Sequence, residues 1–291
     1  MDEREEKRNN YNEWRRFFRV LLSRKIVVFG SSVIILVIGV AIFAPFIAPY
    51  DPYDQSLRKR LQQPSPEHWL GTDPLGRDEL SRIIYATRAS LQVGIVAVGT
   101  AAIFGMALGL LAGFFGGWTN TVIMRFIDAL MAIPPIILAL TFAAFLGGGL
   151  TNLMISVGIA MMPVYCRLTC GLVLSAKTND YVIAEYAMGA SSPRIMLAHI
   201  LPNVFPPLIV QVTLNMGYAI LIEAALSFLG LGISPPGAAW GSMVKDGYRF
   251  LLTNPILSFA PGFAIMLVVF SFNMVGDGLR DALDPRLRGK I

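Results

Sequence analysis

Six long stretches of this chain are apolar and almost free of charge, and this pattern restricts the fold more than any other feature. They lie near residues 26–48, 90–115, 121–146, 152–174, 204–228 and 257–276. About 20 apolar residues in a helix cross the roughly 30 Å hydrocarbon core of a bilayer, so each stretch is long enough for one crossing. A helix also satisfies its own backbone polar groups, which lipid cannot do. We therefore expect an all-α membrane protein with six transmembrane helices.

The composition supports a place in a bilayer and argues against other classes. Only 15% of the residues are charged and 55% are hydrophobic, whereas a soluble domain carries nearer a quarter charged residues. The net charge of +5 does not indicate nucleic-acid binding, because the basic residues gather at the ends of apolar runs. Cys166 and Cys170 are too few for a disulfide framework and have no nearby histidine for a metal site, so we expect ordinary packing residues.

The distribution of charge predicts the orientation. The first 25 residues hold eight Lys or Arg and five acids, and the uncharged run after them is longer than the apolar core of a cleaved signal peptide. We therefore predict an uncleaved first span with both termini in the cytoplasm, which places 16 of the 24 Lys and Arg on the cytoplasmic side. The predicted segments are a cytoplasmic tail (1–25), a first transmembrane helix (26–48), an external segment with an interfacial helix (49–89), a five-helix core (90–276) containing a cytoplasmic loop (176–203), and a cytoplasmic tail (277–291).

The loop 176–203 carries unusually complete helix-ending signals, and we call it the elbow. The Asn179-Asp180 pair can cap a short helix, and Gly189 can end it in the left-handed conformation. Pro193 then favours the first turn of a second helix, which Pro202 is expected to end. We predict two short helices at an angle on which another protein pushes. The residues assigned to this contact are Asp180, Tyr181, Ile183, Ala184, Glu185, Ala187, Met188, Gly189, Ala190, Ser191 and Pro202.

Polar and helix-breaking residues within the spans are the candidates for a pore. Arg125 and Asp128 lie one turn apart in the third span, and Pro134-Pro135 must kink or unwind that span because it removes two backbone donors. Arg167 in the fourth span either extends to the cytoplasmic boundary or pairs with Asp128. Glu223, the only acid well inside an apolar run, forms either a hydrogen-bonded pin between helices or part of an ion path.

Two further patterns concern contacts. Gly105, Gly109 and Gly113 recur every four residues in the second span and predict a close helix pair, within the chain or with another subunit. Turn-forming residues before this span predict either a surface loop or a docking surface for an external partner, followed by a separate amphipathic helix near residues 80–85. The candidate docking residues are Trp69, Gly71, Asp73, Gly76, Arg77 and Asp78.

Signals for catalysis are missing from the sequence. It contains no Gly-x-x-x-x-Gly-Lys-Ser/Thr loop to hold phosphates. Its two histidines, His68 and His199, fall on opposite sides of the predicted membrane, so they form neither a zinc site nor part of a catalytic triad. We predict a non-catalytic chain with no cofactor or metal of its own.

These motifs together resemble the permeases of ABC importers, in particular the second permease subunit of the dipeptide/oligopeptide and nickel branch. The elbow is similar to the family's EAA loop, with Ile183-Ala184-Glu185, then Gly189, then Leu201-Pro202, although the family's Glu position falls on Ile183. The segments Ala48–Pro52, His68–Arg82 and Gly276–Pro285 resemble the same branch.

The resemblance implies a type I importer permease in the inner membrane of a prokaryote. It would form half of a pore for peptides together with a homologous second permease. Two ATPase subunits would bind ATP and Mg and receive the elbow's first helix in a cleft, and an external binding protein would deliver the solute. Nickel complexes, glutathione and other small solutes remain alternatives. An ion-coupled transporter using Glu223, Asp128 and Arg167 is a further alternative, but the sequence has no evident inverted repeat.

Overall fold

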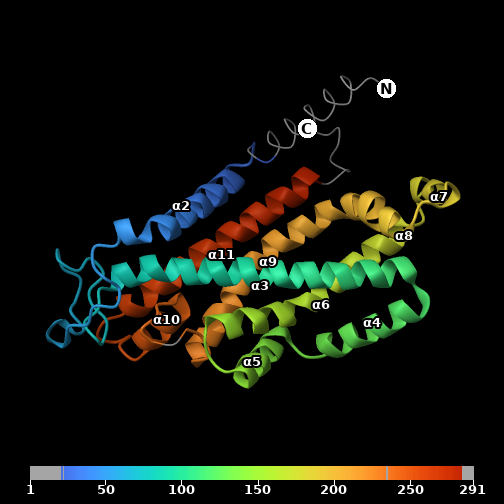
Figure 1. Cartoon of the computed structure of the whole chain (residues 1–291). Helices are drawn as coiled ribbons and strands as arrows, with labels where there is room; N and C mark the ends of the chain where they lie inside the picture. Colours follow the sequence, from blue (N-terminus) through green and yellow to red (C-terminus); the bar gives the residue numbers. More distant parts are fainter. Residues whose placement is uncertain (1–20, 22, 234, 284–291) are drawn as a thin grey trace.

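The computed structural model describes residues 21, 23–233 and 235–283, and their regular elements are all helices (Figure 1). Most of the predicted N-terminal tail and the last part of the C-terminal tail, residues 284–291, lie outside the described residues. The helices are α2 (Lys25–Ile47), η1 (Leu57–Lys59), α3 (Glu79–Phe115), α4 (Gly117–Met131), α5 (Pro135–Leu146), α6 (Leu150–Ala176), α7 (Asp180–Ala187), α8 (Ser192–Arg194), η2 (Ile195–Ile200), α9 (Leu201–Leu229), α10 (Trp240–Tyr248) and α11 (Ile256–Leu283).

The long helices account for the predicted membrane crossings. In the described residues, five helical segments are long and apolar enough to span a bilayer, and α4 with α5 makes a sixth if the bent pair is one span. These two helices meet at an angle of 89°. The break lies at Pro134-Pro135, where the sequence predicted a kink or unwinding, so that prediction is confirmed. The all-α fold class is confirmed as well.

The bundle has two different ends (Figure 1). At one end α7 projects beyond the long helices, and we call this the elbow end. At the other end, residues 48–78 and α10 form a compact layer, which we call the cap. Trp240 of α10 is buried and donates from Nε1 to the carbonyl oxygen of Ile83, 3.1 Å away, so the cap is bonded to the start of α3.

The glycine stripe of α3 packs directly against α6, as the sequence predicted for a pair within the chain. A Cβ atom at Gly105 would lie 2.6 Å from the Met162 carbonyl oxygen, and one at Gly109 would lie 2.4 Å from that of Cys166. These separations are too short for any side chain, so only glycine permits the approach. Cys166 and Cys170 are free thiols buried in this contact, which confirms that they are packing residues.

Helix α2 is hydrogen-bonded to α3 at a point where its own backbone lacks a donor. Pro45 has no N–H group, so the Ala41 carbonyl one turn earlier loses its helical donor. The Arg88 side chain of α3 supplies the replacement, donating from Nε to Ala41 O at 2.6 Å and from Nη2 to Ile42 O at 3.1 Å. The proline and the arginine thus form one joint between the two helices.

Two predicted helix boundaries were wrong. Residues 80–85 do not form a separate interfacial helix, because α3 runs unbroken from Glu79. The Asp78 side chain accepts from Ser81 N–H at 2.8 Å and starts the helix there, and no proline or glycine interrupts it before Gly94. The last helix, α11, likewise continues past residue 276 to Leu283 instead of ending before a separate short helix.

Candidate functional site

The elbow contains the predicted short helix and the predicted glycine stop. Helix α7 covers Asp180–Ala187, one residue earlier than the predicted Tyr181–Met188. Asn179 occupies the N-cap position, but its side chain makes no capping hydrogen bond. Gly189 has φ = +79°, in the left-handed region. Around it, Ala190 N–H donates to Glu185 O at 3.0 Å and Gly189 N–H donates to Tyr186 O at 3.1 Å. This is a Schellman ending, which requires a left-handed residue at the glycine position.

One face of α7 is anchored to the bundle. Val182 is fully buried in an apolar cluster with residues of α3, α6 and η2, including Phe114 and Ile195. The Tyr186 ring stacks on Phe114, with 6.1 Å between the ring centroids and 19° between their planes. The α7 helix is therefore packed on its inner face rather than free in solvent.

The other face of α7 is exposed and almost uncharged. Met188 is 72% exposed, Ile183 54% and Tyr181 39%, and Ala184 and Ala187 lie on the surface beside them. Ile183, which stands at the family's Glu position, points to the outside without a charge. We call Tyr181, Ile183, Ala184, Ala187 and Met188 the outer face of α7. This is a small apolar projection of the size that a cleft in a partner could enclose.

The chain leaves the elbow as a nearly continuous helix. Pro193 lies in the first turn of α8, as predicted, but Pro202 does not end the second helix, so that prediction was wrong. Residues Ile195–Ile200 form a π-helix, in which Leu201 N–H donates to Met196 O five residues earlier. The wider turn changes the backbone register before the proline, which then stands in the first turn of α9 and requires no donor.

Arg167 and Asp128 form an ion pair, which was one of the two alternatives that the sequence left open for Arg167. The Arg167 guanidinium of α6 binds the Asp128 carboxylate of α4, and both side chains are about half exposed on the surface of this chain. Arg125 is also exposed on α4, one turn before Asp128. Charges at this depth are costly against lipid, so this face is suited to a polar path or to another protein chain.

Glu223 connects two helices of the core. It is fully buried in α9, where its carboxylate accepts from Ser227 Oγ at 2.7 Å and from Ser90 Oγ of α3 at 3.2 Å. This is the geometry that the interpretation as a helix–helix pin requires. Its role in transport stays a prediction.

A polar group that the sequence did not predict lies earlier in the same helix. In α9 the Gln211 amide donates to the Asn215 Oδ1 atom at 3.1 Å, and both side chains are partly exposed. The hydroxyl group of Tyr165, buried in α6, has no hydrogen-bond partner among the described residues. Two amides four residues apart within an otherwise apolar run were the signal in the sequence that could have identified this group.

Most of the predicted docking residues lie inside the cap and not on its surface. Trp69 is 69% exposed, but Gly71, Asp73, Gly76, Arg77 and Asp78 are buried, so their assignment to a docking surface was wrong. Their side chains fold the segment itself. Arg77 Nε lies 2.6 Å from Asp73 Oδ2, and the His68 ring lies 2.9 Å from Asp78 Oδ1.

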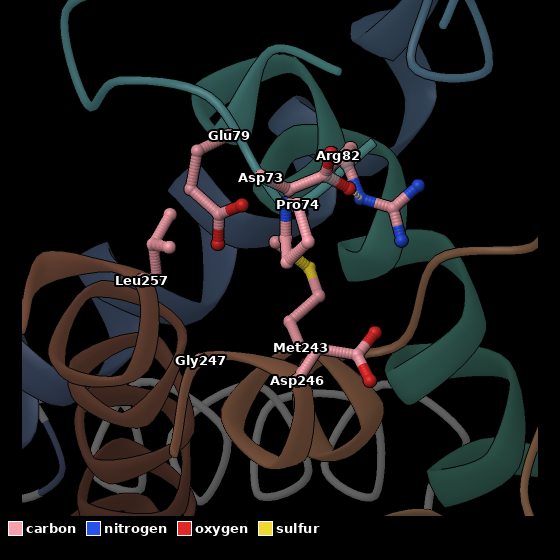
Figure 2. A pocket seen from close by; sticks show the side chains of 8 residues that line it. All are labelled: Asp73, Pro74, Glu79, Arg82, Met243, Asp246, Gly247 and Leu257. Carbon is pink, nitrogen blue, oxygen red and sulfur yellow. Dashed lines mark ion pairs between the residues drawn. The ribbon is translucent and has the colours of Figure 1, made fainter. Parts of the chain in front are cut away.

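The cap closes over a small charged cavity between the start of α3 and α10 (Figure 2). Its volume is about 10 Å³, room for about one water molecule. The Glu79 side chain points into it, and its Oε1 atom has no hydrogen-bond partner among the described residues. Beside it, Arg82 Nε lies 3.5 Å from Asp73 Oδ2. The lining residues are Asp73, Pro74, Glu79, Arg82, Met243, Asp246, Gly247 and Leu257. In the part of the chain described, no cluster of His, Cys, Asp or Glu could hold a metal ion.

The fold and the elbow together define a class of protein: a multi-pass membrane permease whose projecting short helix stands between its fourth and fifth crossings. A solved structure with the same fold is the inward-facing MetNI methionine ABC transporter, which matches with a TM-score of 0.58 and 18% identity over 70% of this chain and 98% of that chain. At this identity the likeness concerns the fold alone.

The family follows from sequence comparison. Residues 105–289 match the family described as binding-protein-dependent transport system inner membrane component, and residues 12–64 match the N-terminal transmembrane domain of oligopeptide transport permease C. The chain is 46% identical to the dipeptide transport system permease protein DppC of Alkalihalophilus pseudofirmus, covering 94% of this chain and 90% of the relative. It is 40% identical to the glutathione transport system permease protein GsiD of Pectobacterium atrosepticum, covering 94% and 92%.

The chain therefore belongs to the family of binding-protein-dependent transport system inner membrane components. It is the permease of an ABC importer and a multi-pass protein of a prokaryotic inner membrane. The resemblance to the dipeptide/oligopeptide branch, drawn from three separated motifs, is confirmed.

Proposed function

We propose that this chain is a non-catalytic half of a pore that imports small peptides. A homologous second permease forms the other half, two ATPase subunits bind ATP and Mg on the cytoplasmic side, and an external binding protein delivers the peptide. The observation that carries this proposal is the outer face of α7, a nearly uncharged projection at the end of the bundle opposite the cap.

The elbow is suited to receive force from an ATPase. A helix of eight residues is too short to be stable alone, so its shape depends on Val182, Tyr186 and the Gly189 ending. A partner cleft that closes around the outer face buries Ile183 and Met188 and moves α7 as a unit. The motion then has a direct route, because α8, η2 and α9 continue from the elbow into the membrane.

This arrangement requires one orientation of the chain in the membrane. With the elbow in the cytoplasm, both termini are cytoplasmic and the cap is external, where a binding protein and its solute arrive. Met188 and Leu252, respectively 72% and 101% exposed, lie at opposite ends of the bundle and serve as reporters. After the two native cysteines are replaced, a cysteine at Leu252 should react with an impermeant maleimide in intact cells, and one at Met188 only after permeabilisation. The reverse pattern contradicts the orientation.

Peptides are the proposed solute because they fit both relatives: glutathione is itself a small peptide, so one chemistry covers the dipeptide and glutathione permeases. The paired charges of Arg167 and Asp128 match the carboxylate and ammonium ends of a zwitterion. Charged side chains at this position make the transport path polar, but they do not select which side chains the peptide carries.

The proposal is tested with the whole importer reconstituted in lipid vesicles. Uptake of labelled dipeptide, glutathione and nickel is measured with the binding protein outside and ATP at the ATPase side. We expect ATP-dependent peptide uptake. Ile183→Asp, which places a charge on the outer face of α7, should release the ATPase subunits during purification, whereas Leu252→Asp, at the opposite end of the bundle, should retain them. Uptake by this chain without ATPase subunits refutes the proposal.

A further inference from the structure

Glu185 does not belong to the outer face of α7, although it lies in the middle of the helix. Its side chain is only 17% exposed and turns toward the bundle. The Oε1 atom lies 3.4 Å from Nε2 of His199, whose side chain is 28% exposed. The sequence assigned this carboxylate to contact with the partner, but it is directed to η2, on the other side of the Gly189 turn.

The contact joins the two arms of the elbow, by which we mean α7 on one side of the Gly189 turn and α8 with η2 on the other. Glu185 belongs to α7 and His199 to η2, and Gly189 with its left-handed turn lies between them. The remaining contacts between the arms are apolar, centred on Val182 and Ile195. Apolar contacts are not directional, so they hold the arms together without fixing the angle between them.

His199 also stands where the second arm is most easily deformed. The π-helix Ile195–Ile200 carries one wider turn, and such turns are rare and frequently occur at functional sites. If this turn tightens into an α-helix, the extra residue is passed along the chain and the following side chains rotate by about 100°. A push on α7 can therefore be absorbed at two places, at Gly189 and in the π-helix, before it reaches α9.

We propose that Glu185 and His199, which we call the elbow pair, fix the angle between α7 and the root of α9, so that displacement of α7 moves the membrane helix. This inference rests on the proposed function, because it assumes that the ATPase pushes on α7. In it Glu185 and His199 are positioning residues, which act through the helices that they connect. The outer face binds the partner, and the elbow pair transmits the movement.

The experiment measures the coupling between ATP hydrolysis and uptake in the reconstituted importer. Removing a partly exposed pair changes a conformational equilibrium by about 0.2–1 kcal/mol, which corresponds to roughly a 1.4- to five-fold effect. For Glu185→Gln and His199→Gln we expect the number of ATP molecules hydrolysed per peptide to rise by about this factor. The ATPase content of the complex and the KM for loaded binding protein should stay unchanged.

A charge exchange separates a pair from two independent residues. Glu185→Lys should lower coupling further, and the double variant Glu185→Lys/His199→Glu should restore it, because a lysine at 185 can then pair with a carboxylate at 199. The matched control is the Lys59–Glu67 pair of the cap, which has the same 3.4 Å separation but lies at the other end of the bundle. Lys59→Gln and Glu67→Gln should leave coupling at the wild-type value.

The outcomes distinguish this inference from the proposed function. If the double variant stays as poorly coupled as Glu185→Lys while the ATPases remain bound, the elbow pair is refuted and the proposed function stands. If Glu185→Lys releases the ATPases and the exchange does not restore them, Glu185 is a docking residue and the inference is again refuted. ATP-independent uptake by the wild-type importer overturns the proposed function itself.

Discussion

Replacing Gly109 by alanine perturbs the close contact between α3 and α6. The new Cβ atom would lie 2.4 Å from the Cys166 carbonyl oxygen and 2.7 Å from Thr169 Cβ, whereas ordinary contacts begin near 3.4 Å. The carbonyl belongs to the α6 backbone and cannot turn aside alone. Helices α3 and α6 must therefore separate by about 1 Å, which loosens the packing along the whole glycine stripe.

The magnitude follows from two opposing effects. Overpacking of this kind costs about 1–3 kcal/mol, and here the obstacle is backbone rather than a flexible side chain, which favours the upper end. Alanine has a better helix propensity than glycine by about 1 kcal/mol, which offsets part of the cost. We expect a net destabilisation of about 2 kcal/mol, or a fall in Tm of roughly 4–8 °C.

The chain carries its own reporters for this measurement. Cys166 and Cys170 are its only cysteines, and both are buried in the α3–α6 contact. A maleimide dye that fluoresces on reaction with thiols therefore follows the separation of these helices as the temperature rises. The matched control is Gly99→Ala in the same helix, where an added Cβ meets no atom within 4 Å. That variant should melt at the wild-type temperature or slightly above it.

Either of two results would refute the reasoning. An unchanged Tm for Gly109→Ala would mean that the bundle accommodates the added methyl group without separating the helices. An equal fall in Gly99→Ala would mean that the effect arises from α3 itself rather than from its contact with α6.

Three further predictions concern single joints of the fold. Gly189→Val, which forces a β-branched residue to φ = +79°, should abolish uptake while the subunit stays in the membrane, measured together by transport and immunoblot; normal uptake contradicts the role of the elbow. Arg88→Ala removes the donor to the Ala41 carbonyl and should lower the free energy of unfolding by about 1–2 kcal/mol, with Arg88→Lys intermediate. Equal thermal stability of the wild type and both variants would contradict this role of Arg88. Glu223→Leu leaves two buried serine hydroxyls without their acceptor and should cost about 1–3 kcal/mol, whereas Glu223→Gln should retain wild-type uptake, a result that an ion path through this carboxylate does not allow.

The features that the sequence predicted are those that depend on local chemistry. The spans follow from apolar length, and the break at Pro134-Pro135 follows from two missing backbone donors. The Gly189 ending is similarly local, because a left-handed residue is required wherever a helix stops in this way. The glycine stripe predicted a close contact, although it named no partner helix, because spacing defines a face of one helix and not what packs on it.

The features that the sequence did not predict depend on contacts between distant segments. Asp73 lies in a segment with the composition of a surface turn. It is buried because α10, more than 160 residues later in the chain, closes over it. Glu185 was assigned to the partner surface because the helical register alone cannot say which face is covered. Pro202 was read as a helix end because the π-turn that accommodates it has no sequence signature of its own.

The segments of the cap and the two arms of the elbow are joined by different kinds of contact, and this difference bears on where the chain can move. At the cap, directional bonds cross between segments: Trp240 bonds to the Ile83 carbonyl, and Gln63 Nε2 donates to Thr253 O at 2.9 Å. At the elbow, the arms meet through an apolar cluster and the single Glu185–His199 contact. Directional bonds break when segments slide by an ångström, whereas apolar surfaces keep most of their contact. A force applied to α7 should therefore shift the two arms of the elbow relative to each other while the cap stays intact.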